Sequence, residues 1–261
     1  EQLAKLLDCV NQKLDRTWLR EFTLEAGRPD TITAEKLKAA KAGGVTRISI
    51  NPQTLNDEVL RTIGRCHTTD DFFRAFDMAK NCGIEYINTD LIAGLPGEDF
   101  ASFSRGLDTV LSLNPDNLTV HTFCVKKAAD ILKSGTEIYS RTGGDTGKSI
   151  DYSQFRAKMS GYLPYYLYRQ KNSIGNFENV GFAHPGAEGL YNILIMEEVH
   201  SIFAVGAGAV TKLVPLGNRP LERIFMPKYP YEYLAEDRNA SMQEYLGKVR
   251  RFCEKENELK L

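Results

Sequence analysis

The segment INTDLIAGLPGED, residues 87–99, decides the fold class of this chain. Apolar residues dominate its first half, as in a buried strand, and the Gly-Leu-Pro-Gly turn at 94–97 ends that strand. An acid, Asp90, lies among these apolar residues. Because an unpaired carboxylate in an apolar strand is energetically costly, we expect Asp90 to have a partner or a ligand.

Strand-like and helix-like segments alternate on both sides of this strand, from residue 20 to about residue 135. The pattern predicts strands over residues 20–27, 45–53, 84–97 and 116–124, and helices over residues 33–44, 68–83 and 99–113. Thr68 or Thr69 is the predicted N-cap of the second helix, and Gly83 is its predicted C-cap. Strands separated by helices of this length predict right-handed β-α-β units and a parallel sheet.

The chain changes in composition after this region. Residues 133–149 are polar and rich in glycine, which is typical of a linker or a mobile loop. Their last residues, GGDTGKS, resemble a phosphate-binding P-loop. Thr142 stands where that motif requires glycine, however, and no apolar strand precedes it. We therefore disfavour a nucleotide-binding loop at this place.

The remaining residues predict further, shorter elements. Residues 152–170 are helical at first and broken at Pro164, and residues 176–186 form a short strand. The apolar stretch 190–214 contains two glutamates and a histidine, so it is not a membrane span. The tail, residues 241–261, is a charged surface helix.

The composition excludes several classes of protein. The 33 basic and 34 acidic residues give a net charge of −1, so no overall field favours nucleic acid or an anionic membrane. The five cysteines are scattered, without a disulfide framework or a Cys-x-x-Cys pair, which suits a reducing cytoplasm. We find no signal-peptide pattern and no long uncharged apolar run in these residues. We therefore expect a cytoplasmic protein without nucleic-acid or membrane partners.

Polar residues stand at the carboxyl ends of the predicted strands, where parallel α/β folds bind ligands. These residues are Glu25, Gln53, Asp90 and the His121–Cys124 segment, and Arg65 follows in the segment IGRCH. Together they would offer acceptors for hydroxyls and an ammonium group, and an arginine fork for a carboxylate. A zwitterionic ligand that carries a ribose would fit.

A purely structural interpretation remains open for each of these residues. Acids at strand ends often cap the next helix, and Asp90 could form an ion pair with Arg65 or Arg47. The glycines of the Gly-Leu-Pro-Gly segment need only form a tight turn. For any single residue we favour this structural interpretation, whereas four residues at equivalent strand positions favour a ligand site.

The motifs resemble, in order and spacing, the radical S-adenosylmethionine (SAM) barrel of the oxygen-independent coproporphyrinogen III oxidases. The resemblance lies in RISINPQ, IGRCH and NTDLIAGLPG and continues through LNPDNLTVHTF. It resumes in YLYRQKNSIGNFENVGFAHPG and FAVGAGAVTKL, which look like the C-terminal domain of the coproporphyrinogen dehydrogenases of clostridia and bacilli. It covers the chain from about Glu21 to Phe225.

This resemblance implies contacts to SAM at six positions. The cofactor would be bound by the side chains of Glu25, Gln53, Arg65 and Asp90. Cys124 would lie next to the cofactor mainly with its backbone. Val210 would lie where the C-terminal domain closes over the site. The resemblance assigns no catalytic residue and no metal ligand in this chain.

The chain departs from the family pattern in one respect. The Cys-x-x-x-Cys-x-x-Cys motif that holds the family's 4Fe–4S cluster is missing from its sequence, as is a Gly-Gly-Thr-Pro turn. The sequence also starts without Met. We therefore expect a fragment: a truncated α/β radical SAM barrel over residues 1–135, a linker or mobile loop over 136–150, and a smaller α+β domain over 151–261.

The resemblance also implies an activity for the intact protein. This activity is the oxidative decarboxylation of coproporphyrinogen III to protoporphyrinogen IX in heme biosynthesis, with SAM and a 4Fe–4S cluster as cofactors. The expected partners are the porphyrinogen substrate and a protein that reduces the cluster, and we expect a monomer. The fragment alone is expected to be inactive.

Two alternatives stay open. One is a heme-binding chaperone on the same fold, with His121, His184 or His200 as an axial ligand. The other is a radical SAM enzyme that acts on a different substrate.

Overall fold

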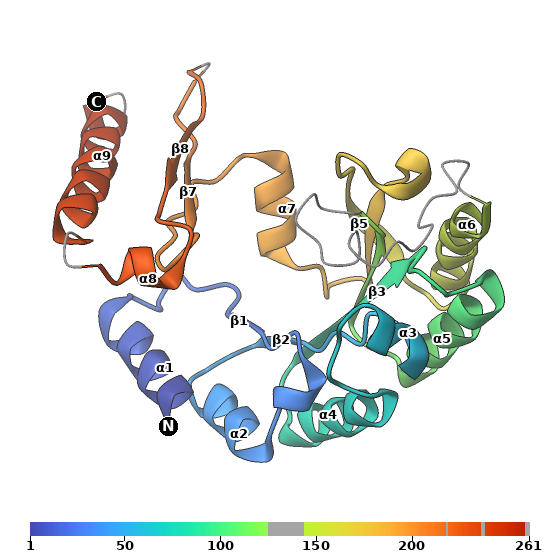
Figure 1. The fold of residues 1–261 in the computed structure, drawn as a ribbon. Helices are drawn as coiled ribbons and strands as arrows, with labels where there is room; N and C mark the ends of the chain where they lie inside the picture. The colour runs from blue at the N-terminus through green and yellow to red at the C-terminus, as the bar shows by residue number, and fades with distance from the viewer. Residues whose placement is uncertain (125–143, 218, 236–237, 259–261) are drawn as a thin grey trace. The chain divides into compact units, whose positions relative to one another are not determined.

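The structure, a computed structural model, describes residues 1–124, 144–217, 219–235 and 238–258 of the chain. It divides into two compact units, Glu1–Leu190 and Tyr191–Leu261 (Figure 1). Among the described residues, no helix combines the length and the apolar character that a membrane crossing requires.

A six-stranded sheet organises the first unit, in the order β1-β2-β3-β4-β6-β5. Its strands are β1 (Thr23–Glu25), β2 (Arg47–Ser49), β3 (Tyr86–Ala93), β4 (Asn117–Thr122), β5 (Leu163–Tyr168) and β6 (Asn179–Ala183). Strands β1 to β4 are parallel, as predicted, whereas β6 runs antiparallel to both β4 and β5. The predicted parallel sheet is therefore confirmed for its first four strands and is extended by an antiparallel pair.

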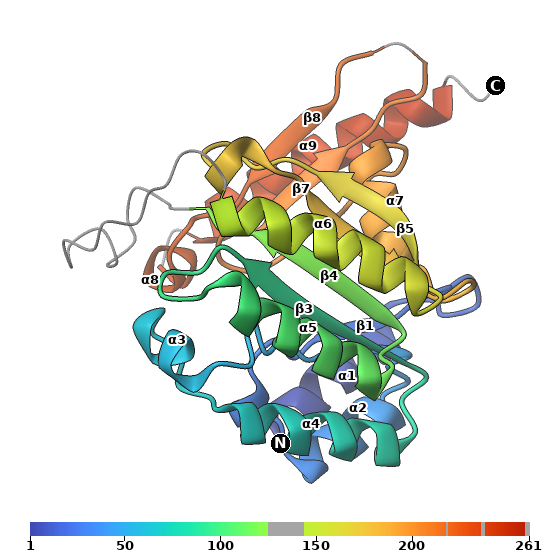
Figure 2. The same ribbon diagram turned by 90° about the vertical axis from the view of Figure 1, so that its right-hand side faces the viewer.

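The helices of this unit lie along the outer side of the curved sheet (Figures 1 and 2). They are α1 (Gln2–Lys13), α2 (Ala34–Ala42), α3 (Asp57–Thr62), α4 (Thr69–Cys82), α5 (Phe100–Leu113) and α6 (Gly144–Met159), with a short 3-10 turn at Pro29–Thr31. Thr68 caps α4 in a reciprocal capping box with Asp71, and Gly83 ends it at φ +73°, so both predicted ends are confirmed. The helix α3 was not predicted, because six residues carry too little periodicity to be recognised.

Strand β3 shows why the two faces of the sheet differ. Its residues alternate strictly between half-buried and buried, with Thr89, Leu91 and Ala93 in the core beneath the helices. Asn88 and Asp90 point to the opposite, inner face. Parallel sheets are usually covered by apolar residues on both sides, so a polar inner face indicates a face that is used for binding.

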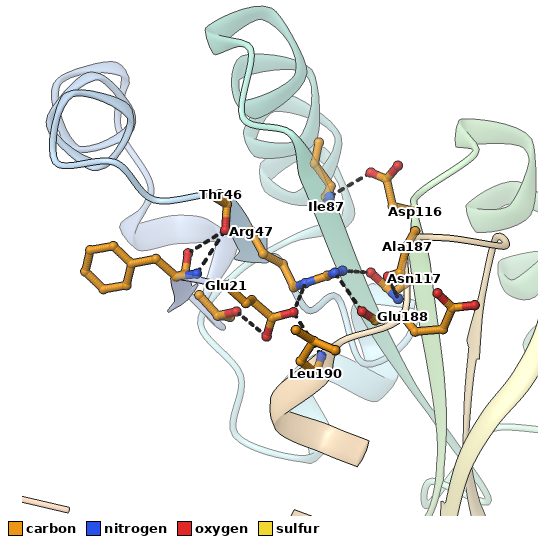
Figure 3. Close-up of polar contacts among 11 residues, drawn as sticks. Glu21, Thr46, Arg47, Ile87, Asp116, Asn117, Ala187, Glu188 and Leu190 are labelled. Atoms are coloured by element: carbon orange, nitrogen blue, oxygen red, sulfur yellow. Dashed lines mark hydrogen bonds and ion pairs between the residues drawn. The ribbon is translucent and has the colours of Figure 1, made fainter. Parts of the chain in front are cut away.

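A buried arginine, Arg47, lies at the N-terminal ends of the strands (Figure 3). The Nε of Arg47 lies 3.3 Å from Oε2 of Glu21, and both side chains are largely buried. The Arg47 guanidinium also donates to Oδ1 of Asn117 and to the carbonyl of Glu188, the latter at 3.3 Å. Its carbon Cζ lies 4.6 Å from the centre of the Tyr86 ring. Arg47 thus joins the starts of three strands.

The same cluster holds the chain that follows β6. The backbone N–H of Leu190 donates to Oε2 of Glu21 at 3.0 Å, and Nδ2 of Asn117 donates to the carbonyl of Ala187 at 2.7 Å (Figure 3). Residues 187–190 are therefore fixed to the N-terminal ends of β2 and β4.

The division between the units differs from the predicted one. We predicted a linker over 136–150, of which residues 136–143 lie outside the described residues. Residues 144–150 begin α6, whose Ile150 and Ala157 belong to the same apolar core as β3 and β4. Residues 163–168, predicted as the broken end of a helix, form the edge strand β5. Pro164 is tolerated there because an edge strand does not need every N–H for pairing.

The second unit is a smaller α+β structure. It contains most of α7 (Leu190–Glu197), the antiparallel pair β7 (Val210–Leu213) and β8 (Glu222–Phe225), and the helices α8 (Pro230–Tyr233) and α9 (Arg238–Glu258). Its core consists of Leu213, Ile224, Met226 and Tyr245.

Candidate functional site

Polar side chains follow one another across the inner face of the first unit's sheet. Their strands pair in register: Glu25 with Ser49, Ser49 with Asn88, and Asp90 with Thr119. We call this set the inner polar row; its members are Glu25, Ser49, Asn88, Asp90, Thr119, His121, Tyr166 and Tyr168. The row crosses β1 to β5, so residues far apart in the sequence form one surface.

Asp90 lies at the centre of the row and has two neighbours there. Nδ2 of Asn88 donates to Oδ1 of Asp90 at 2.9 Å and to Oγ of Ser49 at 2.8 Å. On the other side, Nε2 of His121 lies 3.5 Å from Oδ2 of Asp90. Asp90 forms an ion pair with neither of the two arginines that we considered: Arg47 pairs with Glu21 instead, and the charged neighbour of Asp90 is His121 rather than Arg65.

Glu25 shares an electrostatic environment with Asp90. Removal from water raises the pKa of Glu25, the negative charge of Asp90 raises it further, and a hydrogen bond with Ser49 opposes both effects. Two carboxylates therefore face the same side of the sheet closely enough to affect each other. Such a site favours a ligand with a positive charge or with several hydroxyl donors.

Gln53 is held next to Asp90 by its backbone. Its N–H donates to the carbonyl of Asp90 at 3.1 Å, and the N–H of Ile92 donates to its carbonyl at 2.8 Å. Its φ of +68° lies in the left-handed region, which costs a residue other than glycine about 1–3 kcal/mol. Its side chain forms no hydrogen bond with the described residues, so the amide is available to a ligand.

Arg65 lies in the segment between α3 and α4. This segment packs against Pro52, the residue before Gln53. Nε2 of His67 contacts the carbonyl of Pro52 at 3.0 Å, and this contact fixes the segment. The Arg65 side chain is half-buried, and within the described part of the chain it forms no ion pair. The structure thus brings the segment that contains Arg65 next to Pro52, the residue before Gln53.

The last two predicted SAM contacts, Cys124 and Val210, are not members of the inner polar row. Cys124 follows the end of β4, where it pairs with Ser173, and its Sγ donates to the carbonyl of Lys171 at 3.2 Å. Val210 belongs to the second unit, where it pairs with Phe225 at the start of β7, so its role stays a prediction.

Sequence reasoning missed five members of the inner polar row: Ser49, Asn88, Thr119, Tyr166 and Tyr168. Ser49 and Asn88 could have been found from the alternation of a strand, because Asn88 stands two residues before Asp90 and faces the same side. No local signal pointed to Tyr168, because its strand was not predicted.

Glu98 is a further acid, half-buried, just after the Gly-Leu-Pro-Gly turn. Its Oε1 accepts hydrogen bonds from Oγ1 of Thr54 and, at 3.4 Å, from Oγ of Ser102. Its Oε2 is buried and has no partner among the described residues. Burial therefore raises the pKa of Glu98 to about 7. Through Thr54, Glu98 links the turn after β3 to the residue that follows Gln53.

Replacing Glu98 with glutamine should reduce the pH dependence of stability. Because the pKa of Glu98 is about 7 in the folded chain and 4.5 ordinarily, its favourable contribution is lost as the pH rises from about 4.5 through about 7. Glu98→Gln should thus be more stable relative to wild type at about pH 8 than at about pH 5, measured by urea unfolding. Glu58→Gln, on the exposed side of α3, is the control. Equal shifts at both pH values would contradict this assignment.

The residues of the site fit SAM and do not fit an iron–sulfur cluster. The two acids can accept from ribose hydroxyls and an ammonium group, and the available Gln53 amide and Arg65 guanidinium can bind a carboxylate. Within the described ranges, no three His, Cys, Asp or Glu residues are grouped so that they could hold a metal ion. The five cysteines of the sequence also lack the spacing of a cluster motif.

Comparison with known proteins identifies the family of the chain. Residues 12–110 match the radical SAM superfamily. The chain is 39% identical over 235 residues to the oxygen-independent coproporphyrinogen-III oxidase-like protein HemZ of Bacillus subtilis, which covers 88% of this chain and 47% of that protein. It is 32% identical to the heme chaperone HemW of Bacillus subtilis, over 80% of this chain and 52% of that protein.

A solved structure shows the same fold. Coproporphyrinogen III oxidase (HemN) from Escherichia coli, described as a radical SAM enzyme, superimposes with a TM-score of 0.63 at 21% identity and covers 80% of this chain and 48% of that chain. The chain thus spans about half the length of the proteins it matches. It belongs to the radical SAM superfamily, in the family that contains the HemN-like coproporphyrinogen oxidases and the HemW-like heme chaperones.

Proposed function

We propose that the first unit of this chain holds SAM for a radical SAM protein that decarboxylates coproporphyrinogen III to protoporphyrinogen IX. The observation that carries the SAM site is that Glu25 and Gln53 both lie close to Asp90 on neighbouring parts of one sheet. The resemblance to HemZ and the fold of HemN support the substrate.

The chain's own residues would bind and orient the cofactor. Asp90 and Glu25 accept hydrogen bonds from hydroxyl or ammonium donors, and their negative charges favour the positive sulfonium. The Arg65 guanidinium is suited to a carboxylate, which it can bind with two parallel hydrogen bonds. When bound, SAM and a reduced 4Fe–4S cluster supply the radical that removes a hydrogen atom from a propionate side chain.

Replacing Asp90 with alanine should weaken the binding of SAM to the 261-residue chain. Loss of a charged hydrogen-bond partner costs about 1.5–3 kcal/mol, which corresponds to a tenfold to hundredfold increase in Kd. Arg65→Ala should have an effect of the same size, measured by isothermal titration calorimetry. Asp77→Ala, on the exposed side of α4, is the control and should leave Kd unchanged. Equal affinity in all three variants would assign Asp90 and Arg65 to structure alone.

A heme chaperone is the second candidate, and the 32% identity to HemW favours it. Of the three histidines considered, His184 contacts Oδ1 of Asn114 and stacks on Tyr162, and His121 belongs to the inner polar row, whereas His200 is exposed. Heme titration separates the two functions. A tight complex with a shifted Soret band that is lost in His200→Ala would favour the chaperone, and the absence of such a complex would favour the enzyme.

A further inference from the structure

Two tyrosines of β5 cross the inner face and reach β4. The ring of Tyr166 lies against the backbone of β6 at Gly181, where a Cβ atom would come within 1.9 Å of its Cε1. Its hydroxyl lies 3.1 Å from Oγ1 of Thr119. Tyr168 is stacked parallel to Tyr166, with ring centres 6.3 Å apart, and its hydroxyl lies 3.4 Å from Nδ1 of His121. The two rings therefore cover the inner face over β6.

His121 lies where the aromatic part of the face meets the acidic part. Its Nδ1 faces the Tyr168 hydroxyl and its Nε2 faces Oδ2 of Asp90. The Asp90 and His121 side chains are 18% and 26% exposed, so water competes only partly for these contacts. Burial, and then the charge of Asp90, raise the pKa of Tyr168, so its hydroxyl keeps its proton at neutral pH.

The donors and acceptors allow one neutral form of the imidazole. An ionised carboxylate only accepts hydrogen bonds, so the nitrogen that faces Asp90 must carry the proton. Nδ1 is then the acceptor, and the Tyr168 hydroxyl is the group that can donate to it. The direction of donation is thus from Tyr168 to His121 to Asp90. Contacts of 3.4 and 3.5 Å are long for hydrogen bonds.

We propose that His121, oriented by Tyr168, is a positioning residue that fixes the Asp90 carboxylate for its ligand. Nδ2 of Asn88 donates to Oδ1 of this carboxylate at 2.9 Å, and Nε2 of His121 lies 3.5 Å from Oδ2. The carboxylate then cannot rotate, and the remaining lone pairs of both oxygens are directed to the ligand. The arrangement of the three side chains is independent of the ligand's identity, whereas the effect on SAM rests on the proposed function.

The first test is the protonation pattern of the imidazole in the 261-residue chain without ligand. With ¹⁵N-labelled histidine, NMR shifts of the two ring nitrogens should show the Nε2–H form in the neutral imidazole of His121. Tyr168→Phe and Asp90→Ala should each convert this signal to a mixture of both neutral forms. Tyr166→Phe is the matched control, because the same change on the same strand removes a hydroxyl that contacts Thr119 instead. A His121 signal that is unchanged in both test variants would overturn the proposal.

The second test is SAM affinity, measured by calorimetry on folded variants. His121→Phe should raise Kd by about tenfold, because Asp90 loses one of its two holding contacts. His121→Gln, whose amide can still donate to Asp90, should recover most of the affinity. Affinity that is unaffected by His121→Phe would overturn the positioning role and leave His121 structural. If the wild-type chain shows the Nε2–H signal and does not bind SAM, the proposed SAM site fails and the three-residue arrangement stands.

Discussion

Arg47→Ala should reduce the free energy of unfolding of the first unit by about 3–5 kcal/mol, the range for breaking a buried ion pair by removing one partner. The Arg47 side chain is 7% exposed and Glu21 is 13% exposed. The substitution leaves the Glu21 carboxylate and Oδ1 of Asn117 buried without their donor. It also removes the contact with the carbonyl of Glu188.

Urea unfolding followed by far-ultraviolet circular dichroism measures this effect. Arg74→Ala is the matched control. Its ion pair with Asp71 lies at the surface, where Arg74 is 62% exposed, so the loss should stay below about 1 kcal/mol. Equal losses for Arg47→Ala and Arg74→Ala would show that the cluster in Figure 3 does not hold the strands together.

The double variant Arg47→Met with Glu21→Gln adds a second check. Removing both charges together avoids the uncompensated carboxylate, so this variant should be more stable than Arg47→Ala. A double variant that is no more stable would show that the loss comes from packing around Tyr86 rather than from charge.

The largest functional effect that we expect is a complete absence of turnover in the 261-residue chain. Its sequence contains five cysteines and no Cys-x-x-x-Cys-x-x-Cys motif, so the chain has no set of thiolates with the spacing that holds the family's cluster. Without a reducing cluster, SAM is expected to bind and to remain uncleaved.

This expectation is checked by anaerobic iron–sulfur reconstitution of the purified chain, followed by assays for protoporphyrinogen and for cleaved SAM. The calorimetric Kd of the same sample serves as the control, because it separates a chain that binds without reacting from one that does not bind. Formation of either product above the level of a protein-free sample would refute the prediction.

Local patterns in the sequence determined much of the fold. The βα alternation from β1 to β4 and the ends of α4 at Thr68 and Gly83 follow from periodicity and capping, which act within a few residues. The segment NTDLIAGLPG was enough to place Asp90 within a strand. These features are encoded by neighbours in the chain, so they could be predicted without the structure.

The tertiary structure alone decided the partners of Asp90 and the end of the first unit. The sequence left Arg65, Arg47 or a ligand as possible partners, whereas the structure pairs Asp90 with Asn88 and His121. The segment LPYYLY becomes a strand only because β6 pairs with it and glycine at 181 leaves room for the Tyr166 ring. Contacts between strands far apart in the sequence depend on register and packing, which local periodicity does not contain.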